Sequence, residues 1–343
     1  MPFLLRRAGQ AAIVLIAAFT ATFFLLQLLP GDAVLIKFTD PSLGLSQAQI
    51  DDIRASYGTD LPWWQQYLHA LAGFAVGDFG YSTQFGTPVS AMLAEALPST
   101  LLLASLGLLV AVLLAVAIAA TSTLARFGWL RDAIRQAPAL FVAVPVFWLG
   151  ILLIQVFSFG LGWVPIIGAD PFSALILPVL TLAVPISAPL AQVLVRSIDQ
   201  VQSAPFITVV RAKGAPPSWV LTRSVARNAA LPALTIAGVL FGELIGGAVV
   251  TETVFGRTGI GRLTEQAVTN QDIPVLQAIV LLSALGFVIV SLAVDLITPV
   301  IDPRLRTPAR PASGRGKSVP PAAAPAAEPV DPEPVAPEKE VVA

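Results

Sequence analysis

Six apolar segments, each long enough to cross a membrane, constrain the fold more than any other feature of the chain. They cover residues 8–29, 99–120, 138–159, 174–195, 233–251 and 275–300. An α-helix crosses a hydrocarbon core of about 30 Å with about 20 apolar residues. Charged residues make up 12% of the chain, whereas a soluble globular protein carries about 25%. The sequence therefore predicts an all-α membrane protein with six transmembrane helices.

The two ends of the chain have different compositions. Residues 1–30 hold Arg6, Arg7 and the first apolar segment, which is too long for the roughly 7–15-residue core of a signal peptide. We therefore expect an uncleaved first span. Residues 302–343 are rich in Pro, Ala and Glu. Such a composition cannot bury enough apolar surface to fold, so this tail is expected to be disordered.

Between these ends lie a polar region, residues 31–98, and a five-helix transmembrane core, residues 99–301. The spacing of apolar residues in the polar region predicts amphipathic helices at 50–57 and 63–71. Aromatic residues such as Trp63 and Trp64 favour a membrane interface. His69 lies among them and is expected to be a hydrated surface side chain.

The distribution of positive charge predicts the orientation. With the amino terminus in the cytoplasm, six spans return the carboxyl terminus to the same side. Of the 20 lysines and arginines, all but Lys37, Arg54, Arg257 and Arg262 then fall inside, as the positive-inside rule requires. We expect a multi-pass protein of the inner membrane with both termini in the cytoplasm.

One long basic segment between spans, residues 205–232, has no acidic residue. A helical pattern runs to Lys213, and Gly214 is typical of a helix C-terminus. After two prolines, a second short amphipathic helix is predicted at 218–228, before the span that opens at Pro232. Two short helices joined at a glycine and held at a membrane surface would form a compact projection that a soluble protein could bind.

The sequence of this segment resembles that of a known protein family. Arg211-Ala212-Lys213-Gly214, followed by Arg227-Asn228-Ala229 and Leu231-Pro232, resembles the EAA-type cytoplasmic loop of ABC-importer permeases for dipeptides, oligopeptides and nickel. Further motifs resemble those of the family and occur in the same order along the chain. They are Glu252-Thr253-Val254-Phe255, Gly259-Ile260-Gly261-Arg262, Asp272-Ile273-Pro274-Val275 and Asp302-Pro303-Arg304. At residues 30–33 the chain reads Pro-Gly-Asp-Ala, where the family has a second proline.

The resemblance implies a type I ABC-importer permease fold, with short periplasmic amphipathic helices and a cytoplasmic coupling helix. It also implies a non-catalytic subunit that forms half of a translocation pathway for peptides. The implied partners are a second homologous permease, two ATPase subunits, an extracytoplasmic substrate-binding protein and the lipid membrane, but no nucleic acid. ATP and magnesium would bind to the ATPase subunits, and this chain itself would hold no cofactor and no metal.

Three groups of candidate functional residues follow from the motifs and the spans. The group implied to couple to the ATPase is Arg211, Ala212, Lys213, Gly214, Arg223 and Arg227. The candidate pathway group is Glu243, Gly246 and Gly247, in which Glu243 either contacts a peptide amino group or hydrogen-bonds to a neighbouring helix. The candidate periplasmic gate or binding-protein contact is Glu252, Gly259, Gly261, Arg262 and Asp272, with plain ordering of a loop as the alternative.

Other spacings in the chain predict contacts within the bundle. Gly238, Gly242, Gly246 and Gly247 have the small-residue spacing that permits close helix contact. Asp295, near the inner end of the last span, is expected to pair with an arginine of a cytoplasmic loop. An intramembrane charge is by default a candidate functional group.

Two other functional classes fit the sequence less well. An intramembrane protease needs a Ser–His pair or two intramembrane aspartates, but the single histidine, His69, lies outside the spans. A stand-alone channel or secondary transporter would not need the glycine-hinged cytoplasmic segment. The chain has no cysteine, which excludes disulfides and cysteine-based metal sites. Within the permease class, peptide, nickel-chelate and glutathione-like cargo all remain open.

Overall fold

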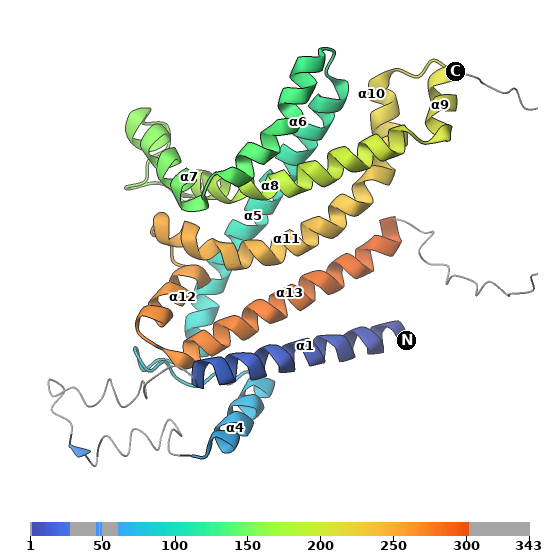
Figure 1. The fold of residues 1–343 in the computed structure, drawn as a ribbon. Helices are drawn as coiled ribbons and strands as arrows, with labels where there is room; N and C mark the ends of the chain where they lie inside the picture. Colours follow the sequence, from blue (N-terminus) through green and yellow to red (C-terminus); the bar gives the residue numbers. More distant parts are fainter. Residues whose placement is uncertain (1, 28–45, 48, 50–60, 302–343) are drawn as a thin grey trace, which may run out of the picture.

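The computed structural model describes residues 2–27, 46–47, 49 and 61–301, and this part of the chain is helical with no β-strand (Figure 1). The elements are α1 (Pro2–Gln27), α4 (Trp63–Val76), α5 (Val89–Leu124), α6 (Gly128–Ala143), α7 (Val146–Leu153), the π-helical turn η2 (Ile154–Gly160), α8 (Ser173–Gln202), α9 (Pro205–Ala212), α10 (Pro217–Trp219), the π-helical turn η3 (Val220–Val225), α11 (Ala226–Val254), α12 (Ile260–Thr269) and α13 (Ile273–Ile301). The predicted helix at 50–57, the turn at 30–33 and the carboxyl-terminal tail lie outside the described residues.

Among the described residues, five helices are long and apolar enough to cross a membrane, and a bent pair can supply a sixth span. That pair is α6 with α7 and η2, which meet at an angle of 101°. The predicted single span at 138–159 is therefore wrong in detail, because the helix breaks between Ala143 and Val146. Val144 before Pro145 is extended, with φ −88° and ψ 121°, as the steric demands of a following proline favour.

Helix α5 is longer than predicted at both ends. Its 36 residues extend about 54 Å at 1.5 Å per residue, well beyond a hydrocarbon core of about 30 Å. The predicted span begins at residue 99, yet Pro98 lies inside α5. The first turns of α5 bury Val89, Leu93 and Ala96 against α12 and α13. This packing offsets the hydrogen bond that a proline removes from a helix.

Small side chains let α5, α8 and α11 approach closely at the centre of the bundle. Ala111 and Ala115 of α5 lie in one buried cluster with Ala183 and Ala191 of α8 and Ala237 of α11. With its three prolines inside the helix, α8 is the most buried of the candidate spans among the described residues. Close contact through small residues is a common way for membrane helices to associate.

The glycines of α11 divide into two pairs. A Cβ added to Gly238 would overlap Val294 of α13, and one added to Gly242 would lie 3.0 Å from the Phe287 ring. For these two positions the predicted close helix contact is confirmed. A Cβ on Gly246 or Gly247 would meet no atom within 4 Å, so for these two the expectation of close contact within this chain is wrong.

Helices α1 and α4 complete one flank of the bundle. Helix α1 packs on α13, and Arg7 forms an ion pair with Asp295. Asp295 thus pairs with an arginine, although the partner belongs to α1 instead of a cytoplasmic loop. Helix α4 packs on α1 through Tyr67, whose ring lies 5.4 Å from that of Phe19. His69 is exposed on α4, as predicted.

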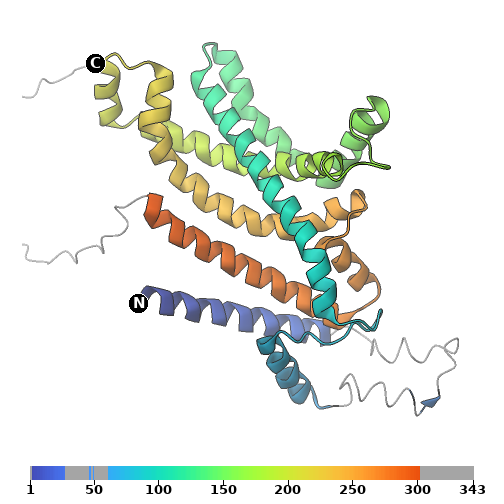
Figure 2. The same cartoon turned by 180° about the vertical axis from the view of Figure 1, so that it is seen from behind.

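The bundle has two distinct ends, and both views agree on them (Figures 1 and 2). The amino-terminal end of α1, the carboxyl-terminal end of α13 and the α9–α10 segment all lie at one end. Helices α7 and α12 lie at the opposite end. A partner that binds α9 would therefore lie at the same end of the bundle as the start of α1 and the end of α13.

Candidate functional site

A short helical projection stands between α8 and α11, and we call residues 205–225 the coupling knob. Proline opens both of its helices, Pro205 in α9 and Pro217 in α10; a proline at this position leaves no hydrogen bond unmade. Gly214 lies between them with φ of +82°, a left-handed conformation that favours glycine. The knob therefore turns at the residue predicted to be its hinge.

The second helix of the knob does not stand apart from the span. A helix at 218–228 was expected to end before a new span at Pro232. Instead α10, η3 and α11 form one candidate span, Pro217–Val254, with Pro232 inside α11. The second helix of the knob is thus continuous with α11.

A buried cluster fixes the knob to the bundle. Ile207 of α9 packs with Val220, Leu221 and Val225. The same cluster includes Ala119 of α5, Ile198 of α8 and Ala229 of α11. Since Ile207, Val225 and Ala229 have no exposed surface, the knob is packed closely against three spans.

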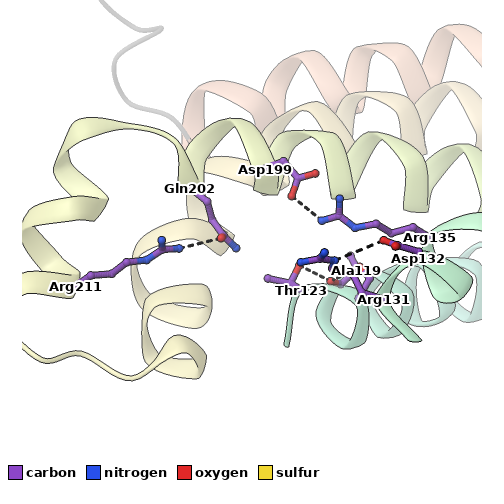
Figure 3. A network of polar contacts seen from close by, with 9 residues as sticks. Ala119, Thr123, Arg131, Asp132, Arg135, Asp199, Gln202 and Arg211 are labelled. Carbon is purple, nitrogen blue, oxygen red and sulfur yellow. Dashed lines mark hydrogen bonds and ion pairs between the residues drawn. The ribbon is translucent and has the colours of Figure 1, made fainter. Parts of the chain in front are cut away.

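Polar contacts converge on the last turns of α8 beside the knob (Figure 3). Arg135 of α6 donates to Asp199 at 2.8 Å, and Arg211 of α9 donates to Gln202 at 3.0 Å. These groups are partly exposed to solvent, where ion pairs contribute little stability. Their effect is to orient α6 and α9 relative to the same end of α8.

The outward surface of the knob is both basic and apolar. The predicted residues Arg211, Ala212, Lys213, Gly214, Arg223 and Arg227 are all exposed. Phe206 and Val209 of α9 are also exposed, at 47% and 57%. These two and Lys213 have the i, i+3, i+7 spacing of one helix face.

Sequence reasoning identified the cations of the knob and missed the apolar side chains. A signal for them exists, because Phe206, Ile207, Val209 and Val210 form an apolar face that covers close to half of the circumference of α9. A face this wide can contact more than one partner. Ile207 packs against other residues of this chain, whereas Phe206 and Val209 are exposed and available to contact another molecule.

The three candidate pathway residues lie on the outward surface of α11. Glu243, Gly246 and Gly247 are all exposed within this chain, and their spacing places them on one helix face. Glu243 makes no hydrogen bond or ion pair with the described residues. Its predicted hydrogen bond to a neighbouring helix is therefore not formed within the described part of this chain.

Glu252, near the other end of α11, has no exposed surface. Its carboxylate accepts hydrogen bonds from the Thr100 hydroxyl at 2.6 Å, the Gly261 N–H at 2.8 Å and the Arg262 N–H at 3.2 Å. Thr100 in turn accepts the Ile260 N–H at 2.8 Å. One buried side chain thereby joins α5, α11 and the first turn of α12.

The glycines of this loop are required for space. A Cβ on Gly259 would overlap the Glu252 carboxylate, and one on Gly261 would overlap the backbone of Val249. Neither glycine has a left-handed φ, so backbone conformation is not the reason for them. Glu252, Gly259 and Gly261 were predicted to form a periplasmic gate, to contact a binding protein or to order the loop. Their buried contacts within this chain fit the loop-ordering alternative.

Asp272 has a similar role at the start of α13. It is 1% exposed, and its carboxylate accepts the Ser82 hydroxyl, the Thr83 N–H at 3.1 Å and the Gln84 N–H at 3.3 Å. The loop before α5 is thus attached to α13. Asp272 was also a candidate for the periplasmic gate or a binding-protein contact, and its contacts within this chain fit the alternative of loop ordering.

Comparisons with known proteins cover nearly the whole described chain. Residues 107–307 match the family described as binding-protein-dependent transport system inner membrane component. Residues 1–104 match the N-terminal part of a binding-protein-dependent transport system membrane component. The two matches meet inside α5.

Curated relatives and a solved structure agree with these matches. The glutathione transport system permease protein GsiC of Escherichia coli K12 is 36% identical over 286 residues, which are 83% of this chain and 92% of GsiC. The protein of the same name from Salmonella choleraesuis is 35% identical over 302 residues, or 88% and 97% of the two chains. An inward-facing structure of the MetNI methionine ABC transporter matches with a TM-score of 0.53 and 16% identity, covering 61% of this chain and 96% of that one.

Proposed function

Because the chain belongs to the family of binding-protein-dependent transport system inner membrane components, we propose that its coupling knob docks on an ATPase subunit. The chain is a multi-pass inner-membrane permease of an ABC importer. In the proposal it forms half of the translocation pathway and hydrolyses no ATP itself. The observation that carries the proposal is the exposed face of the knob, in which Phe206 and Val209 lie beside Lys213.

The proposed motion follows from the way the knob is attached. Its buried cluster includes residues of α5, α8 and α11, and its second helix continues into α11. Closure of two ATPase subunits would therefore displace the knob as a unit and tilt these spans. Switching of this kind requires an element with two arrangements that each ligand favours differently.

The other parts of the assembly are proposed from the family and from charge. A second permease would complete the pathway against the exposed face of α11 that bears Glu243, Gly246 and Gly247. A binding protein would deliver cargo at the opposite end from the knob. Both chain termini would lie in the cytoplasm. Peptide cargo, including glutathione-like peptides, is supported by the GsiC relatives and by no residue of this chain taken alone.

A crosslinking experiment tests the docking face. The chain has no cysteine, so Ala212→Cys would be the only thiol in the permease. In membranes that contain the ATPase subunits, we expect it to crosslink to one of them with a yield that changes on addition of ATP. Val76→Cys, 81% exposed on α4, is the matched control and should give no such crosslink. ATP-independent uptake without any crosslink from Ala212→Cys would instead favour the channel alternative.

The hinge glycine gives a second prediction. A Cβ on Gly214 would meet no atom within 4 Å, so a substitution there changes only the backbone preference. A β-branched residue opposes the left-handed conformation by about 1–2 kcal/mol, whereas asparagine tolerates it. We expect Gly214→Val to lower peptide uptake per ATP hydrolysed several-fold in proteoliposomes, with Gly214→Asn close to wild type. Equal coupling ratios for the two variants would contradict the hinge role.

A further inference from the structure

A cavity of about 290 Å³ is walled by the loop before α8, the first turns of α8 and the loop after α11. These parts of α8 and α11 lie at the end of the bundle opposite the knob (Figure 1). Val164, Ile166, Leu177 and Phe255 form apolar parts of the wall. The only charged residue in the wall is Arg257. The volume is at the lower end of the range for small-molecule sites.

Arg257 has little compensation for its charge. Its Nη1 donates to the Ala174 carbonyl at 3.4 Å and its Nη2 to the Ser99 hydroxyl at 3.3 Å, both near the upper limit for a hydrogen bond. Its Nε is buried without a partner. Among the described residues no carboxylate forms an ion pair with Arg257. A partly buried guanidinium in this state favours an added anion.

Asp170 and Glu252 each lie three residues from the cavity wall in sequence, and both are engaged elsewhere. The Glu252 carboxylate accepts from Thr100, Gly261 and Arg262. Asp170 accepts the Ser173 hydroxyl and the backbone N–H groups of Ser173 and Phe172. The Ser173 hydroxyl bond and these two N–H groups lower the pKa of Asp170 from its ordinary value. Asp170 is therefore an anion held at the start of α8 and does not line the cavity.

We infer that this cavity is a subsite for the carboxylate end of a small peptide. A planar guanidinium binds a carboxylate through two parallel N–H bonds, and the apolar wall suits a short side chain. The Thr258 hydroxyl, also in the wall, can add a third donor. A phosphate dianion would need more cationic donors than the wall provides, with the Asp170 anion close by in the chain.

The position of the cavity relates it to the pathway. Arg257 follows α11 by three residues, and the face with Glu243, Gly246 and Gly247 runs along that helix. The inference rests on the proposed function, in which the end opposite the knob receives cargo. Arg257 would bind a peptide carboxylate at the entrance, before its amino group reaches Glu243 about 20 Å farther along the helix.

A labelling experiment on the assembled transporter tests the subsite directly. Ile166→Cys places a single thiol in the cavity wall, and its reaction rate with an uncharged maleimide reports occupancy. We expect N-acetyl-dialanine to slow labelling and its C-terminal carboxamide to have no effect. With Arg257→Gln added, the peptide concentration that gives half protection should rise about tenfold or more; Arg257→Lys should give an intermediate value.

The controls separate the alternatives. The maleimide rate without peptide should be the same with and without Arg257→Gln, which reports an intact cavity. Three results would overturn the inference. The first is equal protection by the acid and the amide. The others are protection by inorganic phosphate equal to that by the peptide, and unchanged protection by the peptide when Arg257→Gln is present. Protection by the unliganded binding protein alone would overturn it in favour of an acidic side chain of that protein.

ATP-driven peptide uptake, measured with the same transporter in proteoliposomes, separates a failure of the subsite from a failure of the proposed function. Arg257-dependent protection without uptake would contradict the proposed function and leave the subsite standing. Uptake without protection would overturn the subsite and leave the proposed function intact.

Discussion

Replacing Glu252 by alanine is expected to destabilise the protein strongly. The change leaves three donors without an acceptor in a region with no exposed surface: the Thr100 hydroxyl and the N–H groups of Gly261 and Arg262. Each buried donor without a partner costs about 1–3 kcal/mol. We expect a total loss of about 3 kcal/mol or more, measured as a lower midpoint of thermal unfolding in detergent by tryptophan fluorescence.

Glutamine at this position should not restore stability, although it has the same shape. One carboxylate oxygen accepts from Thr100 and the other from two N–H groups. An amide has only one oxygen, so its NH₂ group must face either the Thr100 hydroxyl or the two N–H groups, and an N–H cannot accept a hydrogen bond from a second N–H. Thr100 could accept the amide as well as the Ile260 N–H, but its own O–H would then lose its acceptor.

Glu243 provides the matched control on the same helix. Its side chain is exposed, so Glu243→Ala should leave the unfolding midpoint close to that of the wild type. Equal midpoints for Glu252→Ala and Glu243→Ala would show that the buried carboxylate does not hold α5, α11 and α12 together.

The spans were predictable from the sequence because the bilayer imposes a length on apolar helices. The type I importer fold inferred from the motifs is confirmed by the family matches and by the similarity to the methionine transporter. Helix boundaries at prolines were less predictable. Pro98 and Pro232 lie inside continuous helices, whereas Pro145 follows a break. Local rules treat all three as helix breakers, and tertiary packing decides among them.

The candidate site was predictable to the extent that it depends on local sequence. Gly214 and the cations of the knob follow from composition and from helix-ending rules. The burial of Glu252 and Asp272 does not, because their partners are distant in the chain. Thr100 lies 152 positions from Glu252, and Ser82 lies 190 positions from Asp272. A single sequence contains no signal for such pairs.

Removing the apolar face of the knob is expected to have the largest effect on assembly. Phe206 and Val209 are exposed in this chain while Ile207 between them is buried, so truncating the outer pair leaves the inner cluster intact. Large side chains at the centre of an interface often contribute 2 kcal/mol or more each, roughly a 30-fold change in affinity. For Phe206→Ala combined with Val209→Ala, we expect copurification of the ATPase subunits to fall at least about tenfold and ATP-driven uptake to fall with it.

Trp129→Ala is the control for this double variant, because Trp129 is 72% exposed on α6 and lies outside the knob. It should leave assembly unchanged, and both variants should unfold at the wild-type temperature. If the double variant retains its ATPase subunits, these side chains contact lipid and the docking face lies elsewhere. If only the double variant loses them, the exposed cations Arg223 and Arg227 cannot be sufficient for docking. The apolar pair would then provide the affinity, with the cations affecting the rate and the orientation of encounter.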